Sequence, residues 1–254
     1  MRAGFVGAFL VCFSVSCSGL LEDSVLQLSS QESLDEGKRL MELEKYRAAS
    51  PYLLHAFEIG PNTLEGREGL LLAADSFFKA GGFGNLVKSQ ARYRDFLNRF
   101  PTSEDAVYAQ FQIGASMAGR MDKPDRDQSL STEALQAFRD VQRFYPTSEY
   151  VELAQVEIEK VRNHLARHEV IVGYFYLRFQ RRGTAQASID RLEGVLEDYP
   201  EFDEMDRVLL YLCRAYATGS TPELEEKAAA TCQRLRDEYP ESPHLKKIPK
   251  NIGS

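Results

Sequence analysis

The sequence has no excess of positive charge. Of its 254 residues, 31 are Lys or Arg and 38 are Asp or Glu, which gives a formal net charge of -7. Neutralising nucleic-acid phosphates requires a clustered basic surface, so this balance argues against a nucleic-acid binder. With 43% hydrophobic and 27% charged residues the composition is that of an ordinary globular chain, which excludes a wholly disordered one.

Patterns for phosphate, calcium or nucleophilic chemistry are also lacking. The glycine-rich stretch 81–84 has no Lys-Ser or Lys-Thr after it and no strand before it, so it predicts a loop rather than a phosphate cradle. Asp122, Asp125 and Asp127 lack the glycine and the closing Glu of an EF-hand, and we expect them to serve turns and helix caps. No Ser, His and Asp or Cys and His arrangement indicates a nucleophile.

The nearest approach to a metal site is a pair of histidines. His164 and His168 are four residues apart on one predicted helix face, a spacing that lets two imidazoles share a metal ion, and Glu169 is adjacent. No third ligand is evident, and the order differs from the His-Glu-x-x-His of metalloproteases. We therefore expect structural or solvent-facing histidines, no metal, no cofactor and no enzymatic activity.

The first residues have the pattern of a targeting segment. Residues 3–16 form an apolar run behind Arg2, and fourteen residues at about 1.5 Å each do not cross a bilayer core of ~30 Å. Residues 1–16 are therefore predicted to be a signal peptide. The sequence Ser14-Val15-Ser16-Cys17 resembles a bacterial lipoprotein processing site, in which the cysteine is acylated and becomes the new amino terminus. A plain cleaved signal and a buried amino-terminal helix are the alternatives.

The lipoprotein resemblance also implies a location. In enteric lipoproteins an Asp directly after the cysteine favours retention in the inner membrane, and here that position is Ser18. The resemblance thus implies an outer-membrane lipid anchor facing the periplasm. Residues 17–33 are expected to form a lipidated, flexible tether.

The strongest positive feature is a repeated aromatic-proline phrase at the ends of amphipathic stretches. It occurs at Pro101, Pro146, Pro200 and Pro240, with a fainter copy at Pro61, and these prolines are 40, 45, 54 and 40 residues apart. Such punctuation is typical of solenoids built from helical hairpins. Solenoids of this kind bind partners and rarely catalyse reactions.

Counting back from each proline identifies the repeat. Tetratricopeptide motifs place Ala, an aromatic residue and Ala twelve, eight and five positions before the proline. Small residues at the first position let two helices approach closely, and bulky later ones fill the groove between them. The five sets are Ala49, Leu53 and Ala56; Ser89, Tyr93 and Phe96; Ala134, Phe138 and Val141; Ser188, Leu192 and Val195; Ala228, Cys232 and Leu235. The pattern predicts an all-α, tetratricopeptide-like helical-hairpin solenoid of about five repeats.

No period-two pattern predicts strands, and the helical periodicity defines the elements. We expect helices near 32–46, 48–59, 64–79, 85–99, 104–119, 130–144, 148–166, 168–181, 184–198, 203–217 and 222–238. The helical stretch 149–181 supplies the extra length of the 54-residue spacing. We divide the chain near residue 147 into an amino-terminal half, 34–147, and a carboxy-terminal half, 148–240, followed by a tail, 241–254.

Two features near the end of the chain have competing interpretations. Cys213 and Cys232 are about one hairpin apart, and an oxidising compartment permits a disulfide. Both lie in apolar helical stretches where a free cysteine packs as a small hydrophobe, which is the interpretation we favour. The compact basic cluster 245–250 is expected to be a frayed, solubilising tail rather than a contact for anionic lipid or an acidic partner patch.

Phrases in the second half of the chain resemble the BamD family of outer-membrane lipoproteins of the β-barrel assembly machinery. They include Tyr145-Pro146-Thr147-Ser148, Leu165-Ala166-Arg167-His168-Glu169 and Asp190-Arg191-Leu192-Glu193-Gly194. The lipoprotein site and the five hairpins add to this resemblance. The matching phrases and repeats span about residues 30–240. A different periplasmic repeat lipoprotein, one that scaffolds envelope division or peptidoglycan factors, is the alternative.

The resemblance implies a scaffold without catalysis. It implies that the carboxy-terminal half binds a POTRA domain of BamA beside other assembly-complex lipoproteins, and that the amino-terminal half receives unfolded outer-membrane β-barrel proteins. Arg191 matches a family arginine that pairs with a BamA carboxylate, and Asp190 and Glu193 flank it; an ordinary surface arginine is the alternative.

Aromatic side chains in the amino-terminal half are the candidates for substrate contact. Phe77, Phe78 and Phe83 are expected to supply pockets for an extended substrate segment on the concave face of the stacked hairpins. Packing in the core is the competing role for these three residues.

Overall fold

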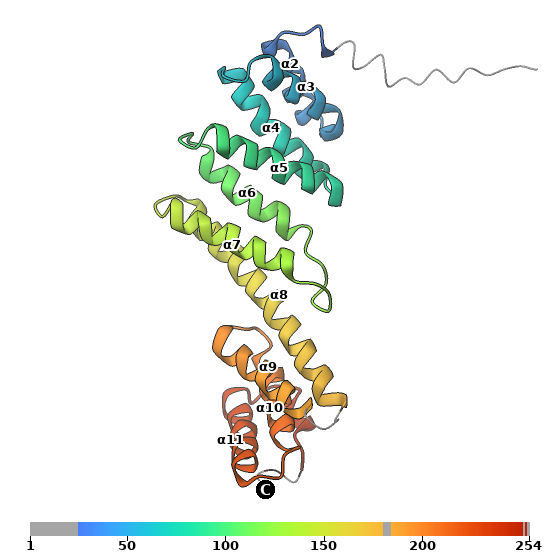
Figure 1. Cartoon of the computed structure of the whole chain (residues 1–254), viewed down its shortest axis with the longest axis vertical. Helices are drawn as coiled ribbons and strands as arrows, with labels where there is room; N and C mark the ends of the chain where they lie inside the picture. Colours follow the sequence, from blue (N-terminus) through green and yellow to red (C-terminus); the bar gives the residue numbers. More distant parts are fainter. Residues whose placement is uncertain (1–24, 180–183, 251, 253–254) are drawn as a thin grey trace, which may run out of the picture. The chain divides into compact units, whose positions relative to one another are not determined.

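A computed structural model describes residues 25–179, 184–250 and 252 of the chain. In these residues helices are joined by short turns, and no strand is present (Figure 1). The chain forms two compact units that divide between Ala80 and Gly81. The division that we predict near residue 147 separates two binding roles rather than two compact units, and it stays a prediction.

Among the residues that the structure describes, the first unit contains three helices, and the second contains seven and a short 3-10 turn. The helices of the first unit are α2 (Ser30–Glu42), α3 (Tyr46–Ile59) and α4 (Leu64–Ala80). Those of the second are α5 (Phe83–Arg99), α6 (Ala106–Ala118), α7 (Ser129–Phe144), α8 (Tyr150–Phe179), α9 (Thr184–Asp198), α10 (Met205–Tyr216), α11 (Pro222–Glu238) and η1 (Leu245–Lys247). Within each unit every helix packs against the next one along the chain.

The proline-based count correctly identifies the core of the repeats. All fifteen residues that it selects are buried, with at most 1% of any of them exposed. Small residues at the first position bring neighbouring helices together, and the bulkier second and third residues fill the space between them. The all-α prediction of packed helical hairpins is confirmed.

The aromatic-proline phrases also end their helices in one recurrent turn. The cap residue adopts φ -128 and ψ 55 at Phe100 and φ -131 and ψ 54 at Tyr145, and its N–H donates to the carbonyl four residues earlier. The N–H three residues further on, of Ser103 or Ser148, then donates to the carbonyl of the cap residue. The proline between them has no N–H to continue the helix, so the chain turns.

Two glycines permit close helix contacts in the second unit. A Cβ atom added at Gly114 would lie 2.8 Å from the ring of Phe138, and one added at Gly173 would lie 2.8 Å from Leu192. Phe138 and Leu192 are the middle residues of the third and fourth repeats. Both repeats therefore place a glycine of the preceding helix against a bulky side chain. Side chains at these two glycines would force neighbouring helices apart.

Cys213 and Cys232 form a disulfide between α10 and α11, so the prediction of free cysteines is wrong. Their Cα atoms are 5.3 Å apart, and both residues are fully buried. Cys232 is the middle residue of the fifth repeat, and Cys213 faces it from the preceding helix as Gly173 faces Leu192. The sequence spacing permits this pairing, but only the packing of the two helices brings the sulfur atoms together.

Helix α8 is a single element of 30 residues, where the sequence predicts separate helices at 148–166 and 168–181. No proline interrupts this segment, and its only glycine, Gly173, is at a helix contact rather than at a turn. The amino-terminal part of α8 packs on α7, and its carboxy-terminal part packs on α9 and α10. One helix therefore serves two consecutive hairpins.

The last described residues fold back onto α10 and α11, so the expectation of a frayed tail is wrong. Ile248 packs against the hydrophobic core, and Ile252 is 9% exposed within it. The Ser242 hydroxyl donates a hydrogen bond to the Asp206 carboxylate (2.5 Å). Burial of these apolar side chains offsets the entropy lost by ordering the segment.

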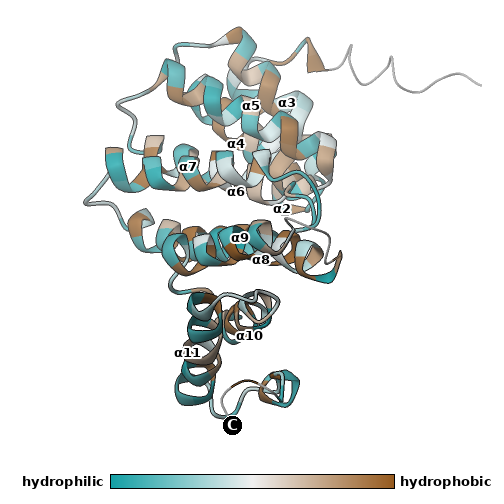
Figure 2. Cartoon of the chain, turned by 60° about the horizontal axis from the view of Figure 1, so that its bottom comes forward, coloured by the Kyte–Doolittle hydropathy of each residue, from teal (hydrophilic) through white to brown (hydrophobic). Residues whose placement is uncertain are grey.

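Hydrophobic and hydrophilic residues alternate along the helices, as expected for elements that are half buried (Figure 2). None of the helices formed by the described residues has the combination of length and apolar character needed to span a membrane.

Candidate partner-binding surface

The seam between α8 and α9 positions the arginine that the sequence resemblance singles out. Arg191 extends from α9 toward α8, and its Nη1 donates a hydrogen bond to Glu169 Oε2 (2.6 Å). The side chains of Arg191 and Glu169 are 49% and 26% exposed. The hydrogen bond to Glu169 raises the pKa of Arg191. The guanidinium is thus held in place and still faces solvent.

Glu169 engages one of the three guanidinium nitrogens of Arg191. Among the described residues the ion pair uses Nη1 alone, so the Nε and Nη2 edge of the guanidinium is not engaged by Glu169. This edge carries two parallel N–H groups, the geometry that binds a carboxylate through two hydrogen bonds. The arrangement suits recognition of a carboxylate by a preorganised arginine.

The two acidic neighbours of Arg191 differ in their surroundings. Asp190 is exposed and accepts a hydrogen bond from Gln186 on its own helix (2.6 Å). Glu193 points toward the following hairpin, where it accepts a hydrogen bond from the Tyr216 hydroxyl (2.5 Å) and lies 3.9 Å from Lys227 Nζ. Burial, followed by the bond to Glu193, raises the pKa of Tyr216. Glu193 therefore connects α9 to α10 and α11, whereas Asp190 is open to solvent.

The three candidate phenylalanines are divided between the two units, with Phe77 and Phe78 in the first and Phe83 in the second. Phe77 and Phe78 are half-buried on α4 in the first unit. Phe83 is the first residue of α5 in the second unit, is 70% exposed and lies 5.7 Å from the guanidinium carbon of Arg120. Contact of these rings with a substrate stays a prediction, and the proposed lipid-bearing Cys17 lies outside the described residues.

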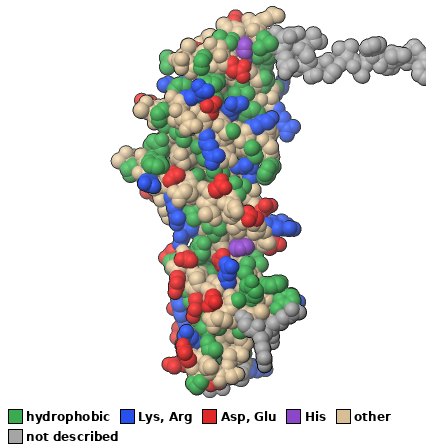
Figure 3. Space-filling view, viewed as in Figure 1, with side chains coloured by type: hydrophobic (Ala, Val, Ile, Leu, Met, Phe, Trp, Pro, Cys, Tyr) green, Lys and Arg blue, Asp and Glu red, His purple; other side chains and the backbone are tan. Residues whose placement is uncertain are grey.

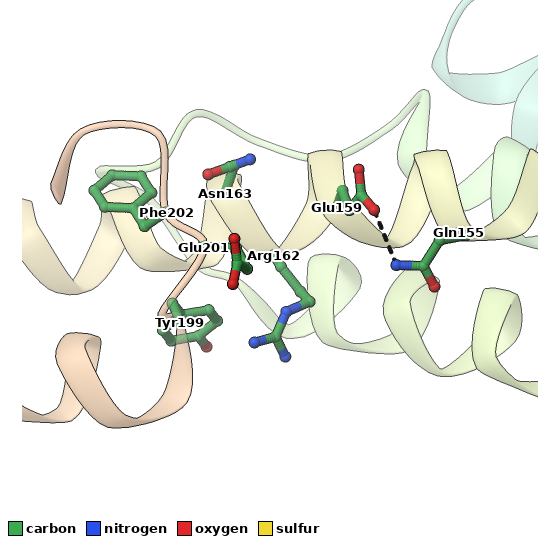
Figure 4. A pocket seen from close by; sticks show the side chains of 7 residues that line it. All are labelled: Gln155, Glu159, Arg162, Asn163, Tyr199, Glu201 and Phe202. Atoms are coloured by element: carbon green, nitrogen blue, oxygen red, sulfur yellow. Dashed lines mark hydrogen bonds between the residues drawn. The ribbon is translucent and has the colours of Figure 1, made fainter.

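A hollow beside α8, lined mostly by polar residue types, is not predicted by the sequence (Figure 4). It has a volume of about 330 Å³ and is lined by Gln155, Glu159, Arg162, Asn163, Tyr199, Glu201 and Phe202. Arg162 lies 5.3 Å from the ring centroid of Tyr199, the aromatic residue of the fourth aromatic-proline phrase. Asn163 accepts a hydrogen bond from the Asp203 N–H (3.0 Å). The residues that line this hollow also anchor the turn between α9 and α10.

Of the further hollows, two are near the predicted repeat core or the substrate half. One, of about 460 Å³, lies between α5, α6 and α7 and has a mixed lining that includes Arg94, Asn98, Met117 and Glu133. The other, of about 780 Å³, is in the first unit and is lined largely by apolar atoms of residues such as Leu26, Leu40, Tyr52 and Leu54. Phe77 and Phe78 do not line this larger hollow.

His164 and His168 contact the backbone of the turn between α6 and α7. His168 Nδ1 donates a hydrogen bond to the carbonyl of Pro124 (2.6 Å), which joins the turn between α6 and α7 to α8. Burial lowers the pKa of His164, although a hydrogen bond with the backbone of Asp122 opposes that effect. In the described ranges no group of three or more His, Cys, Asp or Glu side chains is arranged to hold a metal ion.

Comparison with known proteins assigns the chain to a family. A sequence model of the YfiO family, described as an outer membrane lipoprotein, matches residues 27–231. Outer membrane protein assembly factor BamD of Caulobacter vibrioides is 25% identical over 217 residues, which cover 84% of this chain and 69% of that protein. The BamD of Pasteurella multocida is 25% identical over 232 residues, which cover 87% of this chain and 86% of that protein.

A solved structure, that of a thermophilic TPR protein from Thermus thermophilus, is 16% identical to this chain. The match covers 86% of this chain and 95% of the Thermus chain. Its TM-score of 0.37 is too low to carry an argument. The sequence family is decisive, because its model spans all the helices from α2 to α10 and most of α11. This chain belongs to the YfiO family of outer membrane lipoproteins.

Proposed function

We propose that this protein is a periplasmic scaffold, anchored to the outer membrane by lipid on Cys17, that promotes the assembly of outer-membrane β-barrel proteins. Membership of the YfiO family supports the membrane association, and the name shared by the relatives, outer membrane protein assembly factor, supports the role. That name describes an assembly factor rather than an enzyme, in agreement with the sequence-based prediction of no catalytic activity.

The partner proposed for the carboxy-terminal half is a POTRA domain of BamA. The observation that carries this assignment is the exposed, preorganised guanidinium of Arg191, whose Nε and Nη2 edge is not engaged by Glu169. A carboxylate of the partner would bind this edge in a bidentate manner while Glu169 keeps its hold on Nη1. Asp190 and Glu193 are proposed as flanking contacts, and Glu193 also holds α9 against α10 through Tyr216.

Unfolded barrel proteins are proposed to engage the amino-terminal half. The apolar hollow of the first unit has the chemistry to accept apolar side chains of an extended segment. Phe77, Phe78 and Phe83 remain candidates for additional contacts.

Reversing the charge of Arg191 is expected to weaken the complex with BamA. In Arg191→Glu, a carboxylate replaces the donor and repels both Glu169 and the partner's carboxylate, so we expect the Kd for purified POTRA domains of BamA from the same organism to rise about tenfold or more. Isothermal titration calorimetry at fixed salt measures this change.

Arg234→Glu is the matched control for this experiment. Arg234 is 47% exposed and pairs with Glu238 on α11, so its charge and exposure match those of Arg191. Its affinity should stay within about twofold of the unmodified chain. Equal losses in both variants would indicate a general effect of charge and would contradict the assignment of Arg191.

Removal of the lipid-bearing cysteine tests the anchor separately. In its native host, a Cys17→Ala chain exported behind a signal peptide that is cleaved without acylation should move from the membrane fraction to the soluble periplasmic fraction, because acyl chains supply about 0.8 kcal/mol per buried methylene. Fractionation and intact mass of the mature protein measure this outcome. An unacylated mass for the unmodified chain would remove the anchor from the proposal.

A further inference from the structure

An exposed apolar stripe runs along the last turns of α8. Ile171, Phe175 and Phe179 follow one another at intervals of four residues and are 37%, 54% and 54% exposed. They lie on the opposite face of the helix from Val170, Gly173 and Leu177, which are buried. Figure 3 shows hydrophobic side chains gathered at this end of α8.

The rings of this stripe contact each other rather than the core. The ring centroids of Phe175 and Phe179 are 4.5 Å apart, and those of Phe175 and Tyr176 are 5.7 Å apart in an edge-to-face arrangement. Burying an aromatic side chain of this size is strongly favourable, and neighbouring exposed rings on one helix face are typical of interaction sites rather than of ordinary surface.

The stripe is continuous with the site of Arg191. Tyr176 and Glu169 are seven residues apart on α8, two helical turns along the same face, and Glu169 holds Arg191. Tyr176 lies close enough to Arg191 to contribute to its raised pKa. The surface thus runs from the Arg191 guanidinium through Tyr176 to Phe175 and Phe179. Exposed Arg178 adds a second positive charge beside the rings.

We propose that Ile171, Phe175 and Phe179 form the apolar centre of the interface in which Arg191 is the charged contact. The occupant is the folded periplasmic partner domain that Arg191 binds, and its surface presents a carboxylate next to apolar side chains. This inference rests on the proposed function. Two observations select this occupant: the continuity of the stripe with Arg191, and the two arginine side chains that complement acidic groups.

The arrangement has the anatomy of a binding hot spot. Aromatic side chains that become fully buried, and an arginine beside them, contribute most of the affinity in such interfaces, and polar surroundings exclude water from them. Arg191 would fix the register of the partner through its directional hydrogen bonds. The stripe would supply the larger part of the apolar area that is removed from water.

The test is binding of the same purified POTRA domains to Phe175→Ser and Phe179→Ser in the full mature chain. Each variant is expected to raise the Kd about tenfold or more, and Phe175→Leu, which keeps apolar area, should lose less than Phe175→Ser. Phe144→Ser is the matched control, because Phe144 is 59% exposed on α7 and away from the stripe. Its Kd should change less than about twofold. Circular dichroism and thermal unfolding verify that the variants are folded.

The possible failures are distinguishable. If the stripe variants bind as tightly as the unmodified chain while Arg191→Glu loses affinity, the inference is overturned and the proposed function stands. If the unmodified chain does not bind the POTRA domains, the proposed function fails and the inference fails with it. If the stripe variants change only self-association of the chain in sedimentation experiments, the stripe is an interface between copies and the proposed occupant is wrong.

Discussion

Replacing Phe138 with alanine is expected to destabilise the second unit by about 3–5 kcal/mol. The ring of Phe138 is fully buried, lies 5.5 Å from the ring of Phe111 and packs against the backbone at Gly114. Its removal would leave a cavity that the helices cannot close, because α7 is held on both sides by α6 and α8. Equilibrium denaturation of the purified chain, followed by circular dichroism, measures the loss.

Phe144→Ala is the internal comparison for this prediction. Phe144 is on the same helix and is 59% exposed, so its truncation should change the free energy of unfolding by no more than about 0.5 kcal/mol. Because both variants replace phenylalanine with alanine on α7, the difference between their losses of stability measures the effect of burial rather than of helix propensity. Similar losses for the two variants would contradict the assignment of Phe138 to the repeat core.

Removal of the disulfide is the second large effect. Cys213 and Cys232 are separated by 19 residues, and closing a loop of this size restricts the unfolded chain by about 3 kcal/mol. The double variant Cys213→Ala and Cys232→Ala should lose about that amount. Alanine is preferred to serine because both positions are fully buried, and a hydroxyl there would lack a partner.

Reduction of the unmodified chain provides the control for the disulfide. With a thiol reductant its stability should fall toward that of the double alanine variant, whereas the variant itself should not respond. Thiol titration under denaturing conditions counts the free cysteines in each sample. An unmodified mature chain that shows both thiols free before reduction, with unchanged stability after it, would disprove the bond.

The repeat core and the ends of most helices could be predicted from the sequence because they depend on local chemistry. A proline after an aromatic cap ends a helix whatever surrounds it, and the count behind each proline finds positions such as Tyr93 and Leu192 that are fully buried. The separation of α8 into two helices was wrong because no residue between 149 and 179 demands a turn. Gly173 in that stretch serves helix packing, which local patterns do not reveal.

Features that depend on distant residues could not be predicted. Glu169 and Arg191 are 22 residues apart, and their ion pair requires the packing of α9 on α8. The spacing of Ile171, Phe175 and Phe179 is visible in the sequence, but an apolar stripe on a helix usually faces the core, so its exposure had to come from the structure. The burial of Ile252 also depends on distant residues, because it requires the tail to pack against α10 and α11.

The continuity of α8 constrains how this part of the chain can change in evolution. Each residue of a helix advances it by about 1.5 Å and turns it by about 100°, so a single deletion in the middle of α8 would rotate everything after it relative to α7. His168 would then lose Pro124, and the Glu169–Arg191 pair, both of whose members follow the deletion, would rotate as one body relative to α7. Only insertions or deletions close to whole numbers of turns, such as about seven or eleven residues, would preserve the phase between the two hairpins that share this helix.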